Sequence, residues 1–141
     1  MKRLVLIALM IAAAMGCKKE NDSTTPTDLL GTWRLVGFVE NGTLREATPS
    51  EKECPSCFTI TFKQDKTFQG KSSTNILMGQ YEFDYTQKTF SILNVGGTEI
   101  DESDDGRIFV DMLGKADRYE VKENQLRLYR SEGKQLLFHK K

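Results

Sequence analysis

The chain is poor in the side chains that most often build metal centres and catalytic sites. Its 141 residues include one histidine and three cysteines. A zinc ion takes four ligands, and only His139 is available to join Cys54 and Cys57. A Ser-His-Asp triad would need His139 exposed beside a nucleophile, but this residue follows Phe138 in a predicted terminal strand and resembles an ordinary surface histidine. We therefore expect no metal site, no cofactor and no enzymatic activity.

An excess of charge of one sign and a second long apolar run are also missing. The 20 Lys and Arg residues balance the 20 Asp and Glu residues. Removal of residues 1–16 would take away Lys2 and Arg3, leaving 18 basic and 20 acidic residues and a net charge of −2. Because no basic stripe remains, nucleic acid is not an expected partner. Beyond residue 15, no stretch is apolar enough to cross a membrane.

The N-terminus has the pattern of a bacterial lipoprotein signal. Two basic residues precede the apolar run Leu4–Met15, which is too short to span a bilayer and typical of a signal-peptide core. The segment AAAMGC then resembles a lipobox, in which cleavage before the cysteine leaves that residue, here Cys17, to carry lipid. Ala14 stands where leucine is usual. We predict a signal peptide over residues 1–16 and an acylated Cys17; the alternative is an ordinary secretory signal followed by a free thiol.

A polar segment separates Cys17 from the first predicted strand. Residues 17–27 lack large apolar side chains and contain Pro26, which predicts a flexible tether. Its charged start, KKEND, resembles a surface-export signal of some Gram-negative bacteria, and DST at residues 22–24 is similar to an O-glycosylation site in some of them. A solvated linker without either signal is the alternative. We predict an outer-membrane lipoprotein of a Gram-negative bacterium, exposed on the cell surface if KKEND directs export.

Residues 28–141 have the alternating pattern of a β-rich domain. Apolar side chains recur at every second position in three segments, so each segment is predicted to be a strand with one buried face. These faces are Trp33, Leu35 and Gly37; Phe58, Ile60 and Phe62; and Tyr81, Phe83 and Tyr85. Further strands are predicted at 67–70 and 88–95, whereas the polar segment 40–56 and the turn-rich segment 71–79 are predicted to be connections.

One helix is predicted, at residues 104–116. Asp104 or Asp105 is suited to cap its N-terminus, and Gly114 fits a stop signal. The residues on its apolar face are Phe109, Met112 and Leu113. Three short strands follow, at 118–122, 125–130 and 134–139. The fold class is therefore mainly β (α+β by strict count): a curled, mostly antiparallel sheet or pseudo-barrel of roughly eight or nine strands, with one short helix before the last three.

The order of these elements separates two β-rich families. The opening GTW also occurs in lipocalins, but a lipocalin has its main helix after the barrel strands, whereas this chain ends in a predicted strand. The pattern from Leu29 to Phe138 resembles the META domain family of HslJ-like envelope proteins. The resemblance rests on GTWRL, GKSSTNILMGQYEF, GGTEI, the helix with Phe109 and Leu113, and the ending RYEVKENQLRLY…LLF. It implies one β-rich domain over residues 28–141, an envelope or secreted location, a stress-linked role in some members, and no settled activity.

Two positions depart from the META pattern. Many members have a cysteine just before the asparagine of the middle motif, where this chain has Thr74. A second cysteine usually follows the threonine that corresponds to Thr98, and here Asp101 and Glu102 lie nearby instead. If the two cysteines form a disulfide in the other members, the absence of both from this chain is expected. We therefore do not predict that disulfide here.

The motif CPSC at residues 54–57 is the sharpest local feature. In an exported protein it predicts a structural disulfide between Cys54 and Cys57. Because the closed loop is small, the entropic gain is only roughly 2 kcal/mol. A thioredoxin-like redox centre is the alternative, but it needs the pair at a helix N-terminus, and these cysteines run directly into a predicted strand.

The aromatic residues give the only indication of a binding surface. Trp33 and the stripe of Tyr81, Phe83 and Tyr85 are typical of core and sheet faces, but they would bind a ligand if their face were concave and uncovered. We predict a lipid-anchored, non-catalytic envelope protein with a binding, structural or stress-related role at the outer membrane, acting on an envelope protein or a small ligand. The alternatives are a lipocalin-like carrier, with a cavity lined by Trp33, Phe83 and Phe90, and a thiol-redox protein.

Overall fold

The computed structural model describes residues 28–131 and 133–141. The predicted signal peptide at residues 1–16, the tether at residues 17–27 and the lipidation site Cys17 lie outside these residues. Within the described part of the chain, no helix is long and apolar enough to cross a membrane.

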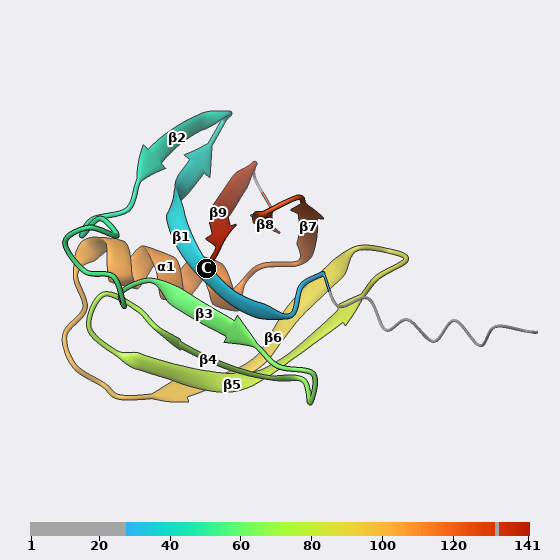
Figure 1. Cartoon of the computed structure of the whole chain (residues 1–141), viewed down its shortest axis with the longest axis horizontal. Helices are drawn as coiled ribbons and strands as arrows, with labels where there is room; N and C mark the ends of the chain where they lie inside the picture. The colour runs from blue at the N-terminus through green and yellow to red at the C-terminus, as the bar shows by residue number, and fades with distance from the viewer. Residues whose placement is uncertain (1–27, 132) are drawn as a thin grey trace, which may run out of the picture.

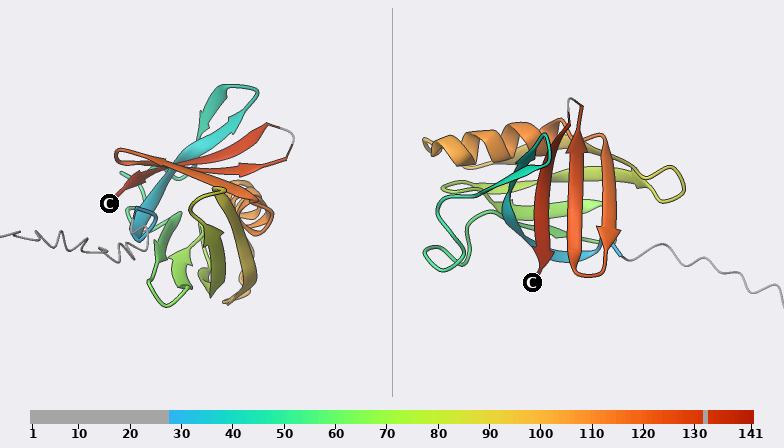
Figure 2. Two further views of the ribbon diagram at one scale, coloured as in Figure 1. Left: turned by 90° about the vertical axis from the view of Figure 1, so that its right-hand side faces the viewer. Right: turned by 90° about the horizontal axis from the view of Figure 1, so that it is seen from above.

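Nine antiparallel strands form one sheet that curls into a ring (Figures 1 and 2). Strand β2 lies at an outer edge beside β1, and β1 also pairs with β9, which closes the ring. The strands are β1 (Gly31–Glu40), β2 (Thr43–Glu46), β3 (Thr59–Phe62), β4 (Thr67–Lys71), β5 (Ile76–Asp84), β6 (Thr89–Gly97), β7 (Arg118–Lys122), β8 (Gln125–Arg130) and β9 (Lys134–Lys140). Helix α1 (Asp104–Gly114) packs against β6 and β9. The predicted fold class, with one helix before the last three strands, is confirmed.

The first strand changes face partway along its length. A register shift between Leu35 and Gly37 makes Val36 an extra residue, which is a β-bulge. After the bulge Phe38 joins the core, so the predicted alternation is wrong at Gly37. A Cβ atom on Gly37 would lie 2.2 Å from the backbone oxygen of Arg45. Glycine therefore permits the close approach of β1 and β2 at this point.

Two segments that were predicted to be connections contain strand residues. Strand β2 lies within residues 40–56 and is exposed along its whole length. Strand β4 extends to Lys71 and β5 begins at Ile76, inside the segment predicted to be a loop. Ile76 and Met78 point outward, with exposed fractions of 51% and 49%, while Leu77 between them is 5% exposed, so apolar residues occupy both faces of the strand there. A sequence pattern finds a strand by the alternation of apolar and polar residues; this alternation is missing at the start of β5, and β2 has no buried face.

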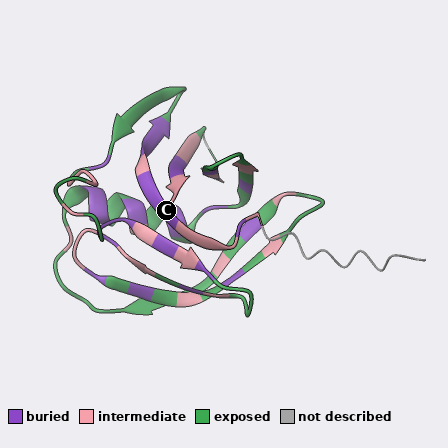
Figure 3. Ribbon diagram, viewed as in Figure 1, coloured by how far each residue is buried: buried purple, intermediate pink, exposed green. Residues whose placement is uncertain are grey.

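Aromatic side chains make up much of the core inside the ring. Figure 3 shows how buried and exposed residues are distributed along the strands and the helix. Phe58, Ile60 and Phe62 are all buried, as predicted. The ring centroid of Phe62 lies 4.8 Å from that of Tyr81 and 5.6 Å from that of Phe90, both in edge-on contact. Rings at these distances and angles attract one another in addition to the area they bury. The interior is therefore a packed core.

The N-cap of helix α1 is neither of the two predicted residues, since the helix already begins at Asp104. Ser103 is the N-cap, and its side chain accepts a hydrogen bond of 3.1 Å from the backbone N–H of Gly106. Asp105 is instead turned toward the β1–β2 hairpin. The helix ends at Gly114, and its apolar face, Phe109, Met112 and Leu113, is buried as predicted. The Phe109 ring meets the Phe58 ring edge-on at 5.6 Å, which joins the helix to the core.

Candidate functional site

A groove outside the ring is the candidate binding site. It lies between the β1–β2 hairpin, helix α1 and the facing ends of β8 and β9, and its volume is about 770 Å³. Pockets that hold small ligands commonly have volumes in this range. The apolar part of its lining comprises Phe38, Val39, Ile108 and Met112. The charged part comprises four basic residues, Arg45, Arg107, Arg130 and Lys134, and two acidic residues, Glu40 and Asp111.

The hairpin that forms one wall of the groove is set by a two-residue turn. Asn41 and Gly42 have φ angles of 49° and 81°, the left-handed conformation that a tight hairpin turn requires. Asn-Gly is the dipeptide best suited to this geometry. The hairpin projects from the ring beside α1, as Figure 1 shows. The turn therefore places the inner face of β2 opposite the helix.

Arg45 and Asp105 hold the hairpin to the start of the helix. A guanidinium nitrogen of Arg45 lies 2.8 Å from an Asp105 carboxylate oxygen, and the guanidinium carbon lies 4.7 Å from the centre of the Phe38 ring. Asp105 also accepts a hydrogen bond of 2.8 Å from the backbone N–H of Thr48. Asp105 thus acts as a link between two elements, rather than as the predicted helix cap.

The other basic side chains of the groove also have acidic neighbours. Arg130 lies 2.7 Å from Asp111, and Lys134 lies 3.6 Å from Glu40. Hydrogen bonding from Lys115, together with the charges of Lys115 and Arg130, holds the pKa of Asp111 below its usual value, so this carboxylate stays ionised near neutral pH. The groove is therefore a strongly charged surface on an apolar base.

The predicted aromatic binding surface is divided between three environments. Trp33 is fully buried, and its indole N–H donates a hydrogen bond of 2.8 Å to the backbone oxygen of Leu29. Tyr81 is also fully buried, whereas Phe83 is only partly buried. Tyr85 lies beyond the end of β5 and is 50% exposed, so the stripe does not form one face. The alternation of buried and exposed side chains ends with strand β5, so Tyr85 is not part of the buried face.

The side chains expected to line a lipocalin-like cavity are also in the core. Trp33 and Phe90 have exposed fractions of 0% and 2%. The Phe83 ring packs edge-on against Tyr119, with 5.8 Å between the ring centroids. These residues contact protein on the inside of the ring. Phe83 and Phe90, but not Trp33, also border a hollow of about 310 Å³, which is smaller than the groove.

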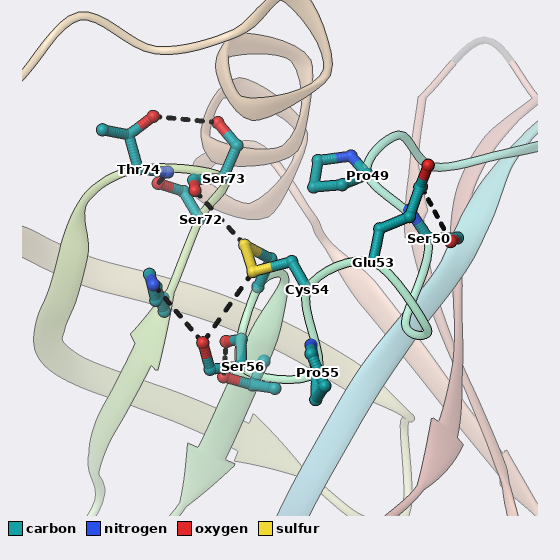
Figure 4. The surroundings of a disulfide bond; sticks show 12 residues. Pro49, Ser50, Glu53, Cys54, Pro55, Ser56, Ser72, Ser73 and Thr74 are labelled. Atoms are coloured by element: carbon teal, nitrogen blue, oxygen red, sulfur yellow. Dashed lines mark hydrogen bonds between the residues drawn. A yellow bond between two sulfur atoms is a disulfide. The ribbon is translucent and has the colours of Figure 1, made fainter.

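Cys54 and Cys57 form a disulfide in the turn before β3 (Figure 4). Cys57 is buried, and its sulfur lies 3.3 Å from the backbone oxygen of Ser73. The pair leads into a strand and not into the N-terminus of a helix. It therefore lacks the helix-terminal setting that lowers a thiol pKa in thioredoxin-like centres.

His139 and Arg34 face each other across β1 and β9, on the side covered by the 47–58 loop. The Nε2 atom of His139 lies 2.8 Å from a carboxylate oxygen of Glu51. Arg34, which the sequence analysis did not single out, is 1% exposed and donates hydrogen bonds to the backbone oxygens of Leu35 (2.6 Å) and Pro49 (3.2 Å). Burial lowers the pKa of Arg34, with Glu51 opposing this effect. Both residues hold the loop in place.

One carboxylate of the acidic run at residues 99–106 accepts several hydrogen bonds. Glu102 accepts hydrogen bonds from Ser72, from Ser73 (2.6 Å) and from the side-chain amide of Asn75 (2.7 Å). Burial acts to raise the pKa of Glu102, but these donors outweigh it and the pKa lies below its usual value. Among the described residues, no group of three or more His, Cys, Asp and Glu side chains is placed to hold a metal ion.

Replacing Glu102 with glutamine is expected to destabilise the protein by about 1–3 kcal/mol, because buried donors lose a charged acceptor. The folded pKa is lowered, so this contribution is present above the unfolded pKa of about 4.3 and is lost as the pH falls through the folded value. Urea unfolding at pH 7 and at pH 3 measures the difference between wild type and E102Q. We expect a smaller difference at pH 3.

The control for this measurement is Glu82→Gln, because Glu82 is exposed on β5. That variant should stay within about 0.5 kcal/mol of wild type at both pH values. A Glu102→Gln penalty that is the same at both pH values would contradict the role of the ionised carboxylate.

These observations define a small antiparallel β-sheet domain with a packed interior and a charged groove on its outside. A family model described as Domain of unknown function (DUF4847) matches residues 27–140. The chain therefore belongs to the DUF4847 family.

Individual proteins are similar to this chain in sequence or in fold. A "Putative lipoprotein" of Tannerella forsythia is 27% identical over 134 residues, which cover 94% of this chain and 89% of that protein. The crystal structure of a DUF4847 family protein from Bacteroides vulgatus matches with a TM-score of 0.62 and 20% identity, over 81% of this chain and 94% of that chain. An NMR structure of a protein from Burkholderia xenovorans matches with a TM-score of 0.64 and 26% identity, over 82% and 86% of the two chains.

The resemblance to the META family is wrong. The DUF4847 family model, together with the solved DUF4847 structure, overturns it. The motifs that carried the resemblance are strand and turn patterns: GTWRL opens β1, and Asn75 ends the turn between β4 and β5. Short patterns of this kind follow from the requirements of an antiparallel sheet and do not identify a family.

Proposed function

We propose that this protein is a lipid-anchored component of the cell envelope, held at the outer membrane by acyl chains on Cys17. The lipobox-like AAAMGC and the preceding apolar run support this proposal. The likeness to a Tannerella forsythia protein that is named as a lipoprotein supports it further. The charged start of the tether, KKEND, favours a position on the outer surface of the cell.

The domain itself acts by binding and carries out no reaction. The observation that carries this proposal is the groove between the β1–β2 hairpin and α1, with its apolar base and four basic side chains. Concave sites of this kind bind ligands through apolar contacts and a few placed polar groups. His139 and the Cys54–Cys57 disulfide lie outside the groove lining, so the groups best suited to chemistry are separated from it. The partner is an envelope protein or a small ligand.

Site-directed photo-crosslinking in intact cells tests the groove. Ile108, which is 39% exposed in the groove lining, is replaced by benzoylphenylalanine in the full chain. We expect an adduct that depends on illumination, detected by mass spectrometry of the purified protein. Tyr85 is the control position, because it is 50% exposed and lies outside the groove. No adduct at position 108, or an equal yield at both positions, would contradict binding in the groove.

A further inference from the structure

We infer that the free edge of strand β6 binds an extended peptide segment of a partner protein, which pairs with β6 as an additional strand. This site shares Arg107 and Asp111 with the groove of the proposed function but is otherwise lined by different residues, and the inference goes beyond that function. It follows from the backbone of β6, from the side chains of this strand, and from the hollow that separates its end from α1.

Strand β6 has one paired edge and one largely free edge. It pairs with β5 along its length, but it meets β7 in a single residue pair, at Thr89. Just beyond its end, the backbone N–H of Thr98 donates a hydrogen bond of 3.2 Å to Ile76 on β5. Backbone groups alternate in direction along an antiparallel strand, so those of Gly97 and Val95 point away from β5. In the described part of the chain, these groups have no backbone partner on that side.

The side chains of β6 do not protect this edge. Residues 89–97, TFSILNVGG, include no charged residue and no proline. Natural edge strands are usually short, charged or interrupted by proline, which keeps other strands from pairing with them. Strand β2, at an outer edge of the sheet, has only four residues, including Arg45 and Glu46. On β6, by contrast, Leu93 and Val95 have exposed fractions of 52% and 40%. An apolar, uncharged edge of this kind is a template for another strand.

A hollow of about 500 Å³ lies between this edge and helix α1. Val95 and Gly97 line it from β6, and Val110 lines it from α1. A single extended chain fits this arrangement with its backbone against β6 and its apolar side chains toward Leu77, Val95 and Val110. In a second copy of this protein, the same edge has its own α1 beside it, so two paired copies would have both helices at the contact. A peptide segment does not meet this obstacle, which favours it over a second copy.

The charges at the hollow favour a basic residue in the peptide. Two charged side chains of the lining already have partners of opposite charge: Arg107 with Asp104, and Asp111 with Lys115 and Arg130. The Glu102 carboxylate accepts hydrogen bonds from neutral donors and keeps its charge. Glu99 also lines the hollow, and among the described residues it forms no ion pair. The hollow and its ion-pair partners thus contain four carboxylates and three basic groups, and a basic side chain of the peptide suits Glu99.

Fluorescence anisotropy with a defined peptide tests the inference. The mature lipidated protein in dodecyl maltoside micelles is titrated into a fluorescein-labelled octapeptide of alternating Thr and Val that ends in two lysines; empty micelles correct for binding to detergent. We expect saturable binding. The same peptide N-methylated at every residue should bind about tenfold more weakly or worse, because it has lost the backbone donors that pair with a strand.

Val95→Pro and Val95→Ala form a matched pair of variants. Proline removes the N–H that points to the free edge and leaves the pairing with β5, whereas alanine keeps this donor. We expect Val95→Pro to weaken binding about tenfold or more and Val95→Ala to weaken it less than about threefold. If Val95→Pro does not fold, Val95→Lys should cause a similar loss, because a charge at a strand edge opposes pairing.

A second pair of variants tests the charge. Glu99→Lys should weaken binding of the lysine-containing peptide by about threefold to tenfold. The control Glu82→Lys makes the same change at an exposed position of β5 outside the hollow and should stay within about twofold. Circular dichroism confirms that all variants are folded.

Other outcomes overturn the inference. Absence of saturable binding, or equal binding of the N-methylated peptide, would mean that no strand is added. Equal affinities of wild type and Val95→Pro would place the peptide elsewhere, and no effect of Glu99→Lys would remove the charge argument. A dimer in sedimentation velocity that Val95→Pro dissociates would assign the edge to a second copy. Adducts at position 108 report on the groove alone, so the proposed function and this inference are tested separately.

Discussion

Replacing Cys17 with alanine is expected to move nearly all of the protein from the membrane fraction to the soluble fraction. Each buried methylene contributes about 0.8 kcal/mol to membrane attachment, so several acyl chains anchor a protein lastingly while a chain without them has no comparable hold. Cell fractionation followed by immunoblotting measures the shift.

The double variant Cys54→Ser/Cys57→Ser is the matched control. It removes two cysteines from the folded domain and leaves Cys17 in place, so the protein should stay with the membrane. A Cys17→Ala protein that remains in the membrane fraction would contradict the lipid anchor. A wild-type protein that is itself found in the soluble fraction would instead favour the ordinary secretory signal as the explanation of AAAMGC.

The sequence predicted the parts of the fold in which burial alternates along one strand. Phe58, Ile60 and Phe62 alternate with polar residues, and all three are in the core. It could not predict the bulge in β1, because an extra residue changes which side chains face inward without altering composition. Strand β2 was missed because none of its residues is buried, yet Asn41-Gly42 was a usable hairpin signal within the same segment.

The groove could not be predicted because its parts come from distant segments. Arg130 on β8 lies 2.7 Å from Asp111 on α1, and Arg45 on β2 lies 2.8 Å from Asp105. Such pairs depend on how the hairpin, the helix and the final strands are placed in space. No local sequence pattern predicts that placement. The aromatic residues stand out in the sequence, so the binding surface was predicted on them, although most of them lie in the interior. There their size serves packing instead of recognition.

Truncation of Phe62 to alanine is expected to destabilise the protein by about 3–5 kcal/mol, the range typical of a large aromatic residue removed from a core. Phe62 is 1% exposed and contacts the rings of Tyr81, Phe90 and Phe68, whose centroids lie 4.8, 5.6 and 6.5 Å away. The loss combines the transfer of the ring from the interior to water with the cavity that remains. Chemical denaturation of the full chain measures it.

The same experiment separates a packed core from the cavity of a ligand carrier. In a carrier, Phe62 would border an existing space, and its removal would cost little because few contacts would be lost. A loss of less than about 1 kcal/mol in the free energy of unfolding would therefore support the hypothesis that the interior is the ligand cavity of a carrier. Leu93→Ala, at a site that is 52% exposed, is the control and should change stability by less than about 0.5 kcal/mol. If Phe62→Ala does not fold, Phe62→Leu should still lose about 1–2 kcal/mol, because a packed site cannot refill the volume of the missing ring atoms.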